Sequence, residues 1–177
     1  ILGSTGSIGT SALDVISGHR DRFRVVGLAA GRNIDLLEGQ IDVFRPEVVA
    51  IADENAAMEL RKRVGRKTEV LAGEDGINSV AAYKGSDFVL SSMVGFSGLI
   101  PTMHAVRAGK AIGLANKEVL VTAGEIVIRE AGRYGSKILP VDSEHSAIFQ
   151  CIEGQDRRYL KRVVLTASGG PFAGRTK

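Results

Sequence analysis

Short runs of almost uninterrupted apolar residues recur along this chain of 177 residues, and segments with helical periodicity separate them. A strand that faces solvent on one side alternates apolar and polar residues, whereas a strand buried on both faces is apolar throughout. This pattern therefore predicts an α/β fold with a Rossmann-like, doubly wound and mostly parallel sheet. The expected strands are residues 1–2, 25–29, 48–51, 88–90, 111–114 and 138–141, and the expected helices are residues 11–17, 54–64, 99–108 and 120–134.

The regular alternation of strands and helices ends near Val141. A loop and a helix follow, and then another apolar run at residues 163–166, expected to be a strand, and a glycine-rich turn. We therefore expect a Rossmann-like domain at residues 1–141 and the beginning of an α+β domain at residues 142–177. Only Ile1 and Leu2 precede the first glycine, whereas a strand usually has about 5–6 residues. Both the first strand and the second domain are expected to be truncated.

The composition argues against several classes of function. The 23 lysine and arginine residues barely exceed the 20 acidic residues, and a basic run occurs only at 61–67, so no nucleic-acid partner is expected. No stretch of 18 apolar residues is present, so no membrane partner is expected either. Cys151 is the single cysteine, which fits a reducing compartment and, with no visible signal peptide, predicts a cytoplasmic location. Because Cys151 lies in an apolar helical stretch, its thiol is expected in the core.

A glycine-spaced loop, Gly3-x-x-Gly6-x-x-Gly9, follows the first expected strand and opens a helix. Glycine permits the tight turn and the close approach of backbone to the pyrophosphate of a dinucleotide. The N–H groups at the helix start, with the hydroxyl groups of the loop, suit a phosphate anion. A glycine turn without a ligand is the alternative interpretation, but the strand–loop–helix setting favours a cofactor site. The candidate cofactor-binding residues here are Gly3, Ser4, Thr5, Gly6, Ser7 and Ile8.

The end of the second expected strand indicates which dinucleotide binds. An NAD enzyme places an acidic residue there, which accepts a hydrogen bond from the ribose 2′-hydroxyl. This chain instead has Gly31, Arg32 and Asn33. A guanidinium and an amide favour a 2′-phosphate, which a carboxylate would repel. NADPH is therefore favoured over NADH, although Arg32 also fits an ordinary surface arginine.

Clusters of polar or small residues follow three further strands, where ligands bind in open α/β sheets. The first, residues 91–95, follows the strand at residues 88–90 and is expected to line the nicotinamide side. Asn116, Lys117 and Glu118 supply an amide, a cation and a carboxylate in one turn. Lys117 can hold a substrate anion or polarise a carbonyl, whereas Glu118 can instead cap the next helix. Asp142 and Glu144 offer two oxygen ligands to one divalent ion, Mg²⁺ or Mn²⁺ rather than Zn²⁺. Such a site needs a third ligand, and a helix N-terminus is the alternative interpretation of this acidic pair.

A hydroxyl group and two glycines follow the last expected strand. Ser168 lies in this segment, residues 166–172. The backbone amides of such a turn can grip a phosphate group. A loop without a ligand fits these residues equally well.

Four segments taken together resemble the 1-deoxy-D-xylulose 5-phosphate reductoisomerase family. They are Gly3-Ser-Thr-Gly-Ser-Ile-Gly9, Ala115-Asn-Lys-Glu118, Val141-Asp-Ser-Glu-His145 and Ala167-Ser-Gly-Gly-Pro-Phe172, in the family's order and approximate spacing. The resemblance runs along the whole chain but covers only the first portion of the family's sequence. It implies an NADP-dependent oxidoreductase of the non-mevalonate isoprenoid pathway. With NADPH and a divalent metal, this enzyme rearranges and reduces 1-deoxy-D-xylulose 5-phosphate to 2-C-methyl-D-erythritol 4-phosphate.

The resemblance also implies roles for individual residues. Residues 5–8 would hold the cofactor phosphates, residues 31–33 the adenosine end, and Asn116 and Glu118 would face NADPH. Lys117 and Glu144 are the candidate catalytic residues. The candidate metal ligands are Asp142 and Glu144, and the candidate substrate-binding residues are Lys117, Ser143, Glu144 and Ser168.

The family's remaining metal carboxylate, substrate-phosphate ligands and C-terminal helical domain are expected beyond Lys177. This chain is therefore expected to bind NADPH with little or no turnover. The family resemblance further implies a sugar phosphate substrate, a homodimer, and the bacterial cytoplasm or, after removal of a transit peptide, a plastid. Two alternatives remain open: an aspartate-semialdehyde-dehydrogenase-like enzyme, which would need a nucleophilic cysteine, and a non-catalytic NADP-binding module.

Overall fold

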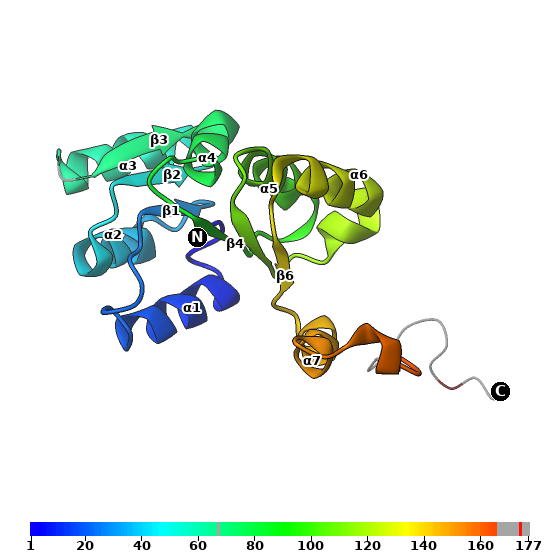
Figure 1. Cartoon of the computed structure of the whole chain (residues 1–177). Coiled ribbons are helices and arrows are strands. Elements are labelled where there is room, and N and C mark those ends of the chain that lie inside the picture. Colours follow the sequence, from blue (N-terminus) through cyan, green and yellow to red (C-terminus); the bar gives the residue numbers. More distant parts are fainter. Residues whose placement is uncertain (67, 166–173, 175–177) are drawn as a thin grey trace. The chain divides into compact units, whose positions relative to one another are not determined.

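The computed structural model describes residues 1–66, 68–165 and 174. It divides the chain into two compact units, Ile1–Leu139 and Pro140–Lys177. The division falls two residues before the domain boundary predicted at Val141. The helices that cover the sheet and all of the sheet except Pro140, the last residue of β6, belong to the first unit, whereas the second unit contains α7 (Ser143–Ile152) and η2 (Arg157–Tyr159) (Figure 1).

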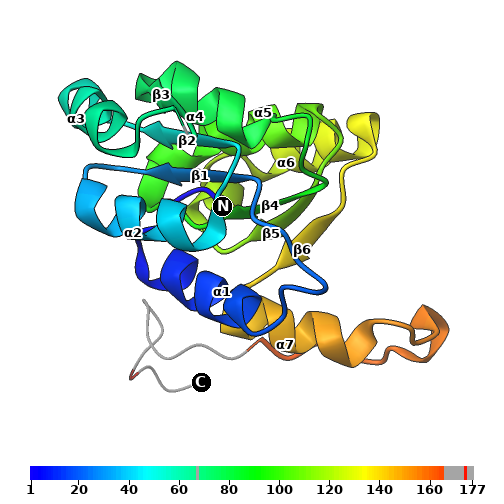
Figure 2. The ribbon, with the colours of Figure 1, turned by 90° about the vertical axis from the view of Figure 1, so that its left-hand side faces the viewer.

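The strands form two groups of three that a single residue joins into one sheet. Leu2 makes parallel bridges to Ala29 of β1 and to Ser91 of β4. The strand order is therefore β3-β2-β1-Leu2-β4-β5-β6, and the pairs β1–β2, β2–β3 and β4–β5 are parallel. Figure 2 shows the six named strands in this order. The strands are β1 (Gly27–Ala30), β2 (Val48–Ile51), β3 (Glu69–Ala72), β4 (Phe88–Ser91), β5 (Ala111–Leu114) and β6 (Ile138–Pro140).

Backbone hydrogen bonds tie Leu2 and its neighbour to both halves of the sheet. The Leu2 N–H donates to the Leu90 carbonyl oxygen at 2.8 Å, and the Leu2 carbonyl oxygen accepts from the Ser92 N–H at 2.9 Å. On the opposite side, the Ala29 N–H donates to the Ile1 carbonyl oxygen at 2.9 Å. This pattern is the hydrogen-bond ladder of a segment that runs parallel to both β1 and β4.

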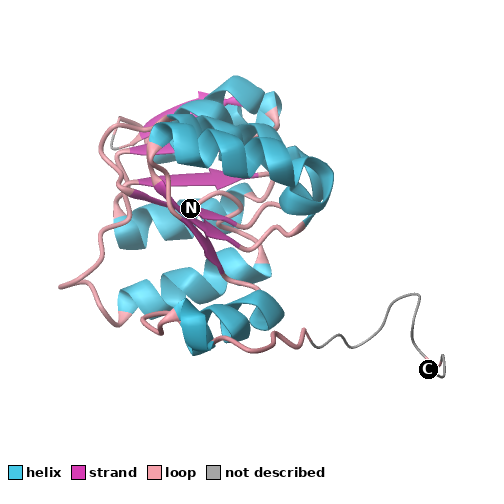
Figure 3. Ribbon diagram, turned by 45° about the vertical axis from the view of Figure 1, so that its right-hand side comes forward, coloured by secondary structure: helices cyan, strands magenta, loops and turns pink. Residues whose placement is uncertain are grey.

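Helices cover both faces of the sheet (Figure 3). One apolar core contains side chains of α1, α2 and α3, and the other contains side chains of α4, α5 and α6. The helices are α1 (Ser7–Ser17), α2 (Ile34–Phe44), α3 (Glu54–Val64), α4 (Gly73–Ala81), α5 (Leu99–Arg107) and α6 (Glu118–Tyr134), with the 3-10 turn η1 (Gly95–Gly98) before α5. None of the helices within the described ranges is long and apolar enough to cross a membrane.

The two cores explain why the strands are apolar throughout. In β2, Val48 and Ala50 belong to the core beneath α4, α5 and α6, while Val49 and Ile51 belong to the core beneath α1, α2 and α3. All four side chains are buried. Successive side chains of a strand point to opposite faces, so a sheet with helices on both sides requires apolar residues at every position. The predicted α/β class is confirmed.

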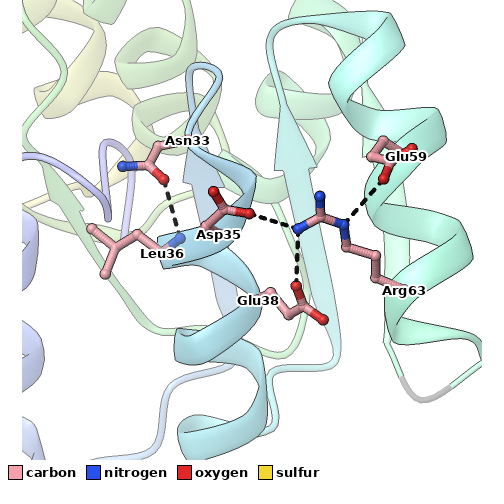
Figure 4. Close-up of polar contacts among 6 residues, drawn as sticks. All are labelled: Asn33, Asp35, Leu36, Glu38, Glu59 and Arg63. Atoms are coloured by element: carbon pink, nitrogen blue, oxygen red, sulfur yellow. Dashed lines mark hydrogen bonds and ion pairs between the residues drawn. The ribbon is translucent and has the colours of Figure 1, made fainter.

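An ion-pair network joins α2 to α3 on the first side of the sheet (Figure 4). Arg63 Nη1 lies 2.6 Å from Asp35 Oδ1 and 3.2 Å from Glu38 Oε2, and Arg63 Nε lies 3.2 Å from Glu59 Oε1. Hydrogen bonds to these carboxylates raise the pKa of the Arg63 guanidinium above its usual value, and the bond to Asp35 has the largest effect. Exposed ion pairs individually contribute little to the free energy of folding. We therefore infer that this network positions α2 relative to α3 rather than stabilising the fold as a whole.

Several elements differ from the sequence-based expectation. β3, α2 and α4 were not predicted, and the strand expected at residues 163–166 is not formed at residues 163–165, while Thr166 lies outside the described residues. β3 lies at the edge of the sheet and begins with the exposed Glu69. Its sequence is therefore not apolar throughout, which is the pattern used to predict the other strands. Residues 163–165 expose between 51% and 66% of their surface, because no described strand pairs with them.

Cys151 is exposed, and the prediction that it lies in a core is wrong. It lies on α7 in the second unit. None of the described residues of this unit is buried. The apolar side chains beside Cys151 therefore form no core that could enclose its thiol.

We expect Leu2→Ala to lower the free energy of unfolding by about 2–5 kcal/mol, because it removes a fully buried side chain at the junction of the two half-sheets. Urea unfolding followed by circular dichroism measures the change. Val121→Ala is the control, since Val121 is 85% exposed and its truncation should alter the stability by less than about 0.5 kcal/mol. A loss for Leu2→Ala no larger than that of the control would contradict the central role of Leu2.

Candidate functional site

The strand order reverses at Leu2. From this residue β1, β2 and β3 extend to one side and β4, β5 and β6 to the other, and Figure 2 shows the N-terminal segment between β1 and β4. In doubly wound sheets, ligands bind beyond the carboxyl ends of the strands at such a reversal. The loops at residues 3–6, 31–33 and 92–98 all begin at these ends.

The glycine loop lies against the ends of β1 and β4. The N–H groups of Gly3 and Ser4 donate to the Ala29 carbonyl oxygen at 2.8 and 2.9 Å. Gly3 has a φ of +85°, and a Cβ atom there would lie 2.8 Å from the Ser92 carbonyl oxygen. A Cβ atom on Gly9 would lie 2.3 Å from the Gly3 carbonyl oxygen. Both positions therefore require glycine for this close backbone packing.

The start of α1 fits an anionic group. Gly6 is the N-cap residue, no side chain of the described chain caps this helix, and its first turn has no acidic residue. Gly6, Ser7 and Ile8 are exposed. The first N–H groups of a helix lack partners within the helix, and its N-terminus carries a partial positive charge. A phosphate group is the usual ligand of such a terminus in this fold.

Ser4 does not present its hydroxyl group to this site, contrary to the expectation from the sequence. Its side chain is fully buried, and Oγ has no hydrogen-bond partner among the described residues. The Ser4 carbonyl oxygen accepts a hydrogen bond of 2.9 Å from Nε2 of buried Gln40, on α2. Ser4 and Gln40 therefore anchor the loop from beneath. Gln40 was not among the predicted site residues, because α2 itself was not predicted.

Arg32 and Asn33 follow β1 at the same edge of the sheet. The Arg32 side chain is 86% exposed, and its Nε lies 3.4 Å from Asp53 Oδ2. Asp53 follows β2 and caps α3 through a hydrogen bond from the Ala56 N–H at 2.9 Å. Asn33 caps α2, because its Oδ1 accepts from the Leu36 N–H at 3.1 Å (Figure 4). The Arg32 guanidinium is thus accessible to an anion, whereas the side-chain oxygen of Asn33 is engaged in capping α2.

The cluster after β5 separates into one buried and two exposed residues. Asn116 is 3% exposed, and its Nδ2 donates to the Gly95 carbonyl oxygen at 2.7 Å. Within the described ranges, Asn116 Oδ1 has no hydrogen-bond partner. Lys117 and Glu118 are exposed at the start of α6. The cluster therefore offers a cation and a carboxylate to solvent and an unpaired buried acceptor beside η1.

The predicted metal ligands lie in the second unit. Asp142 is the N-cap residue of α7, and its Oδ1 accepts from the His145 N–H at 3.0 Å and lies 2.5 Å from His145 Nδ1. Ser143 is exposed and Glu144 half-buried. No group of three or more His, Cys, Asp or Glu side chains in the described part of the chain is placed to hold a metal. The metal site stays a prediction, and Ser168 lies outside the described residues.

The larger cavity of the first unit is not at this edge of the sheet. A cavity of about 880 Å³ is lined by residues at the amino ends of the strands, such as Val26, Gly27 and Phe88. At the carboxyl ends, Gly3, Gly31 and neighbouring side chains line a hollow of about 50 Å³. We place the candidate site at the carboxyl ends, because the glycine loop and the polar clusters converge there.

A doubly wound sheet with a glycine loop at its reversal point and an uncapped helix start defines a dinucleotide-binding domain. The sequence profile of 1-deoxy-D-xylulose 5-phosphate reductoisomerase matches residues 1–124, and the profile of the C-terminal domain of that enzyme matches residues 138–177. The chain belongs to the 1-deoxy-D-xylulose 5-phosphate reductoisomerase family. The resemblance seen in the sequence is thereby confirmed.

Two bacterial reductoisomerases align with all or nearly all of the chain. It is 52% identical over 177 residues to 1-deoxy-D-xylulose 5-phosphate reductoisomerase 1 of Bacillus cereus, covering 100% of this chain and 46% of that protein. The reductoisomerase of Thermodesulfovibrio yellowstonii is 53% identical over 175 residues, covering 99% of this chain and 46% of that protein. The chain thus spans about half the length of these relatives.

Solved structures share the fold. The reductoisomerase from Zymomonas mobilis in complex with NADPH is 41% identical, with a TM-score of 0.89 over 98% of this chain and 46% of that chain. A reductoisomerase in complex with NADPH, fosmidomycin and magnesium is 38% identical, with a TM-score of 0.82 over 90% of this chain and 40% of that chain. These likenesses confirm the Rossmann-like fold.

We expect Gly9→Ala to lower the free energy of unfolding by about 1–3 kcal/mol. The new methyl group would meet backbone atoms of Gly3 and Ser4, which cannot move aside as a flexible side chain can. Gly39→Ala is the matched control, because Gly39 lies within α2 with nothing within 4 Å of its Cβ position. This control should be neutral or stabilising by about 0.5–1 kcal/mol. Equal urea-unfolding midpoints for both variants would refute the close packing of the loop.

Proposed function

We propose that this chain binds NADPH through its first unit. It is part of an enzyme that converts 1-deoxy-D-xylulose 5-phosphate to 2-C-methyl-D-erythritol 4-phosphate with NADPH and a divalent metal. The observation that carries the proposal is the exposed, uncapped start of α1, which Gly3 and Gly9 hold at the reversal of the strand order. Family membership and the NADPH complex of the Zymomonas mobilis relative support it.

The phosphates of the cofactor would lie at the start of α1. Thr5, Gly6, Ser7 and Ile8 would surround them, and the last three are exposed. Thr5, Ser7 and Ile8 can donate backbone N–H groups to the phosphates, whereas the Gly6 N–H donates to the Gly3 carbonyl oxygen at 3.1 Å. Gly3 permits the turn, and Ser4 supports it from the buried side. A bound anion would compensate the partial positive charge that no acidic residue of the first turn offsets.

The adenosine end of the cofactor would lie beyond β1. Gly31 leaves space there, because a Cβ atom on it would meet nothing within 4 Å. The exposed Arg32 guanidinium can pair with a 2′-phosphate, and the Asn33 side chain lies beside it in sequence. This arrangement supports NADPH over NADH.

The reacting end of the cofactor would lie beyond β4 and β5. NADPH supplies the hydride for the reduction step. Asn116 Oδ1 can accept a hydrogen bond there, and Glu118 would face the cofactor at the start of α6. Lys117 can attract the phosphate or polarise the carbonyl of the sugar substrate through its exposed ammonium group.

The second unit would contribute to metal and substrate binding. The carboxylates of Asp142 and Glu144 are hard oxygen donors of the kind that Mg²⁺ and Mn²⁺ prefer, and the structures of related reductoisomerases contain magnesium. Such an ion supplies positive charge for developing oxyanions. Glu144, Ser143 and Ser168 would bind substrate, with Glu144 and Lys117 as the catalytic residues.

We further propose that the complete enzyme is a homodimer of the bacterial cytoplasm. The relatives named above are bacterial, and a single, exposed cysteine is compatible with a reducing compartment. Residues 1–141 would serve as the NADPH-binding domain and residues 142–177 as the beginning of the catalytic domain.

We expect wild-type protein to bind NADPH about tenfold more tightly than NADH, equivalent to roughly 1.4 kcal/mol. Arg32→Ala should abolish this preference by weakening NADPH binding alone, since NADH has no 2′-phosphate. Arg24→Ala is the matched control, because Arg24 is also exposed and paired with a carboxylate, that of Glu47. Fluorescence titration measures both affinities. Equal affinities of the wild type for the two dinucleotides would overturn the cofactor assignment.

We expect this chain to oxidise NADPH no faster with 1-deoxy-D-xylulose 5-phosphate and Mg²⁺ than without the sugar phosphate. The physical reason is that residues 1–177 match 46% of the Bacillus cereus relative, so groups that the rest of such a protein contributes to the active site are not among these residues. The absorbance of reduced nicotinamide follows the reaction, and a complete reductoisomerase assayed alongside serves as the positive control. Metal-dependent oxidation near the rate of the complete enzyme would show that residues 1–177 suffice.

A further inference from the structure

Two buried hydroxyl groups hold the segment between β4 and α5 from below. Ser91 Oγ and Thr102 Oγ1 lie 2.8 Å apart, and Thr102 Oγ1 donates to the Gly98 carbonyl oxygen at 2.6 Å. A threonine hydroxyl has one hydrogen to donate, so Ser91 must be the donor in the first contact. The side chains of both residues are fully buried. The hydrogen bonds therefore run in one direction, from the end of β4 through α5 to the last residue of η1.

A second hydrogen bond fixes the other end of η1. Asn116 Nδ2, after β5, donates to the Gly95 carbonyl oxygen at 2.7 Å. Gly98 packs directly on this amide, since a Cβ atom at Gly98 would lie 2.5 Å from Asn116 Nδ2. The Thr102 and Asn116 side chains thus fix the two ends of η1 relative to β4 and β5.

The same segment also contacts the glycine loop. Ser92 Oγ donates to the Leu2 carbonyl oxygen at 2.7 Å, and the Ser92 backbone lies against Gly3. Residues 92–98 therefore lie between the proposed phosphate site and the cluster after β5. Val94 and Phe96 of this segment are 89% and 64% exposed, so they present apolar surface to solvent.

A dinucleotide spans the two halves of a doubly wound sheet. With the phosphates at the start of α1 and adenosine beyond β1, the nicotinamide must extend over β4 and β5, where residues 92–98 lie. We propose that Thr102 is a positioning residue for the nicotinamide: its buried hydroxyl holds η1 as the wall against which the nicotinamide ring packs. Thr102 is fully buried and touches no ligand itself. This inference rests on the proposed NADPH binding.

Thr102→Val tests the proposal, because valine keeps the shape of threonine but neither donates to Gly98 nor accepts from Ser91. The two probes are NADPH and adenosine 2′,5′-bisphosphate, which lacks the nicotinamide, and calorimetry measures both affinities. We expect a loss of about tenfold in NADPH affinity, or roughly 1.4 kcal/mol. The affinity for the bisphosphate should stay within about twofold, since one hydrogen bond at η1 does not reach the adenosine site.

Two further variants separate positioning from general stability. Thr102→Ser retains the hydroxyl and should restore most of the NADPH affinity. Ser79→Ala is the control outside this segment, because exposed Ser79 on α4 donates to the Asp75 carbonyl oxygen of the same helix at 2.7 Å. This control should bind both probes like the wild type. If Thr102→Val does not fold, Ser91→Ala carries the same comparison with a smaller expected loss of NADPH affinity.

The outcomes distinguish the proposals. Equal losses for NADPH and the bisphosphate, or no loss for either, would overturn the positioning role of Thr102. Selective loss of NADPH affinity with rescue by serine would support it. If the wild-type chain binds neither probe, the proposed NADPH function fails first, and the inference about Thr102 fails with it.

Discussion

Leu2 joins the two halves of the sheet by backbone hydrogen bonds, and the geometry of the candidate site depends on this junction. On one side it pairs with Leu90 and Ser92, while on the other Ile1 and Gly3 pair with Ala29. Gly3 therefore begins its loop from a backbone position that is fixed relative to both β1 and β4. The start of α1, four residues further on, inherits this placement.

The site separates groups that hold the loops from groups that are free to meet a ligand. Ser4, Ser91 and Thr102 are buried and make contacts beneath the loops. Ser7, Arg32 and Lys117, in contrast, are exposed. A site that is rigid before its ligand binds loses less entropy on binding. The buried polar residues beneath the loops therefore matter for affinity although they face away from the ligand.

The sequence predicted the parts of the fold that repeat a simple pattern. β2 and α3 have the predicted bounds, because β2 is buried on both faces and α3 has clear limits at Asp53 and Gly65. α2 and β3 escaped prediction for different reasons. α2 contains Gly39, which lowers helix propensity, and β3 lies at an edge and begins with the exposed Glu69. α2 nevertheless has local support, because Asn33 caps it and Leu37 and Ile41 lie four residues apart on its buried face.

The candidate site was predictable only as a set of sequence segments. The glycine spacing located the loop, but the burial of Ser4 and its contact with Gln40 depend on α2, which no local pattern revealed. Likewise, Thr102 looks like an ordinary helix residue until β4 and η1 are folded against it. The pairing of Asp142 with His145 was also not foreseen, since the acidic pair fits a metal site and a helix start equally well. Residues that act through contacts with segments distant in the sequence can be recognised only when the fold is known.

The proposed selectivity for the 2′-phosphate would be a difference between two opposing charges rather than the effect of Arg32 alone. Asp53 Oδ2 lies 3.4 Å from Arg32 Nε, so a phosphate that approaches the guanidinium also approaches a carboxylate. Asp53 remains in place because its other oxygen caps α3. Both side chains are at least partly exposed, so salt screens the attraction as well as the repulsion. The pyrophosphate contacts at α1 are common to NADPH and NADH and cancel from their comparison. The proposed discrimination between the two dinucleotides would therefore depend on the freedom of the Arg32 side chain to turn from Asp53 toward the phosphate.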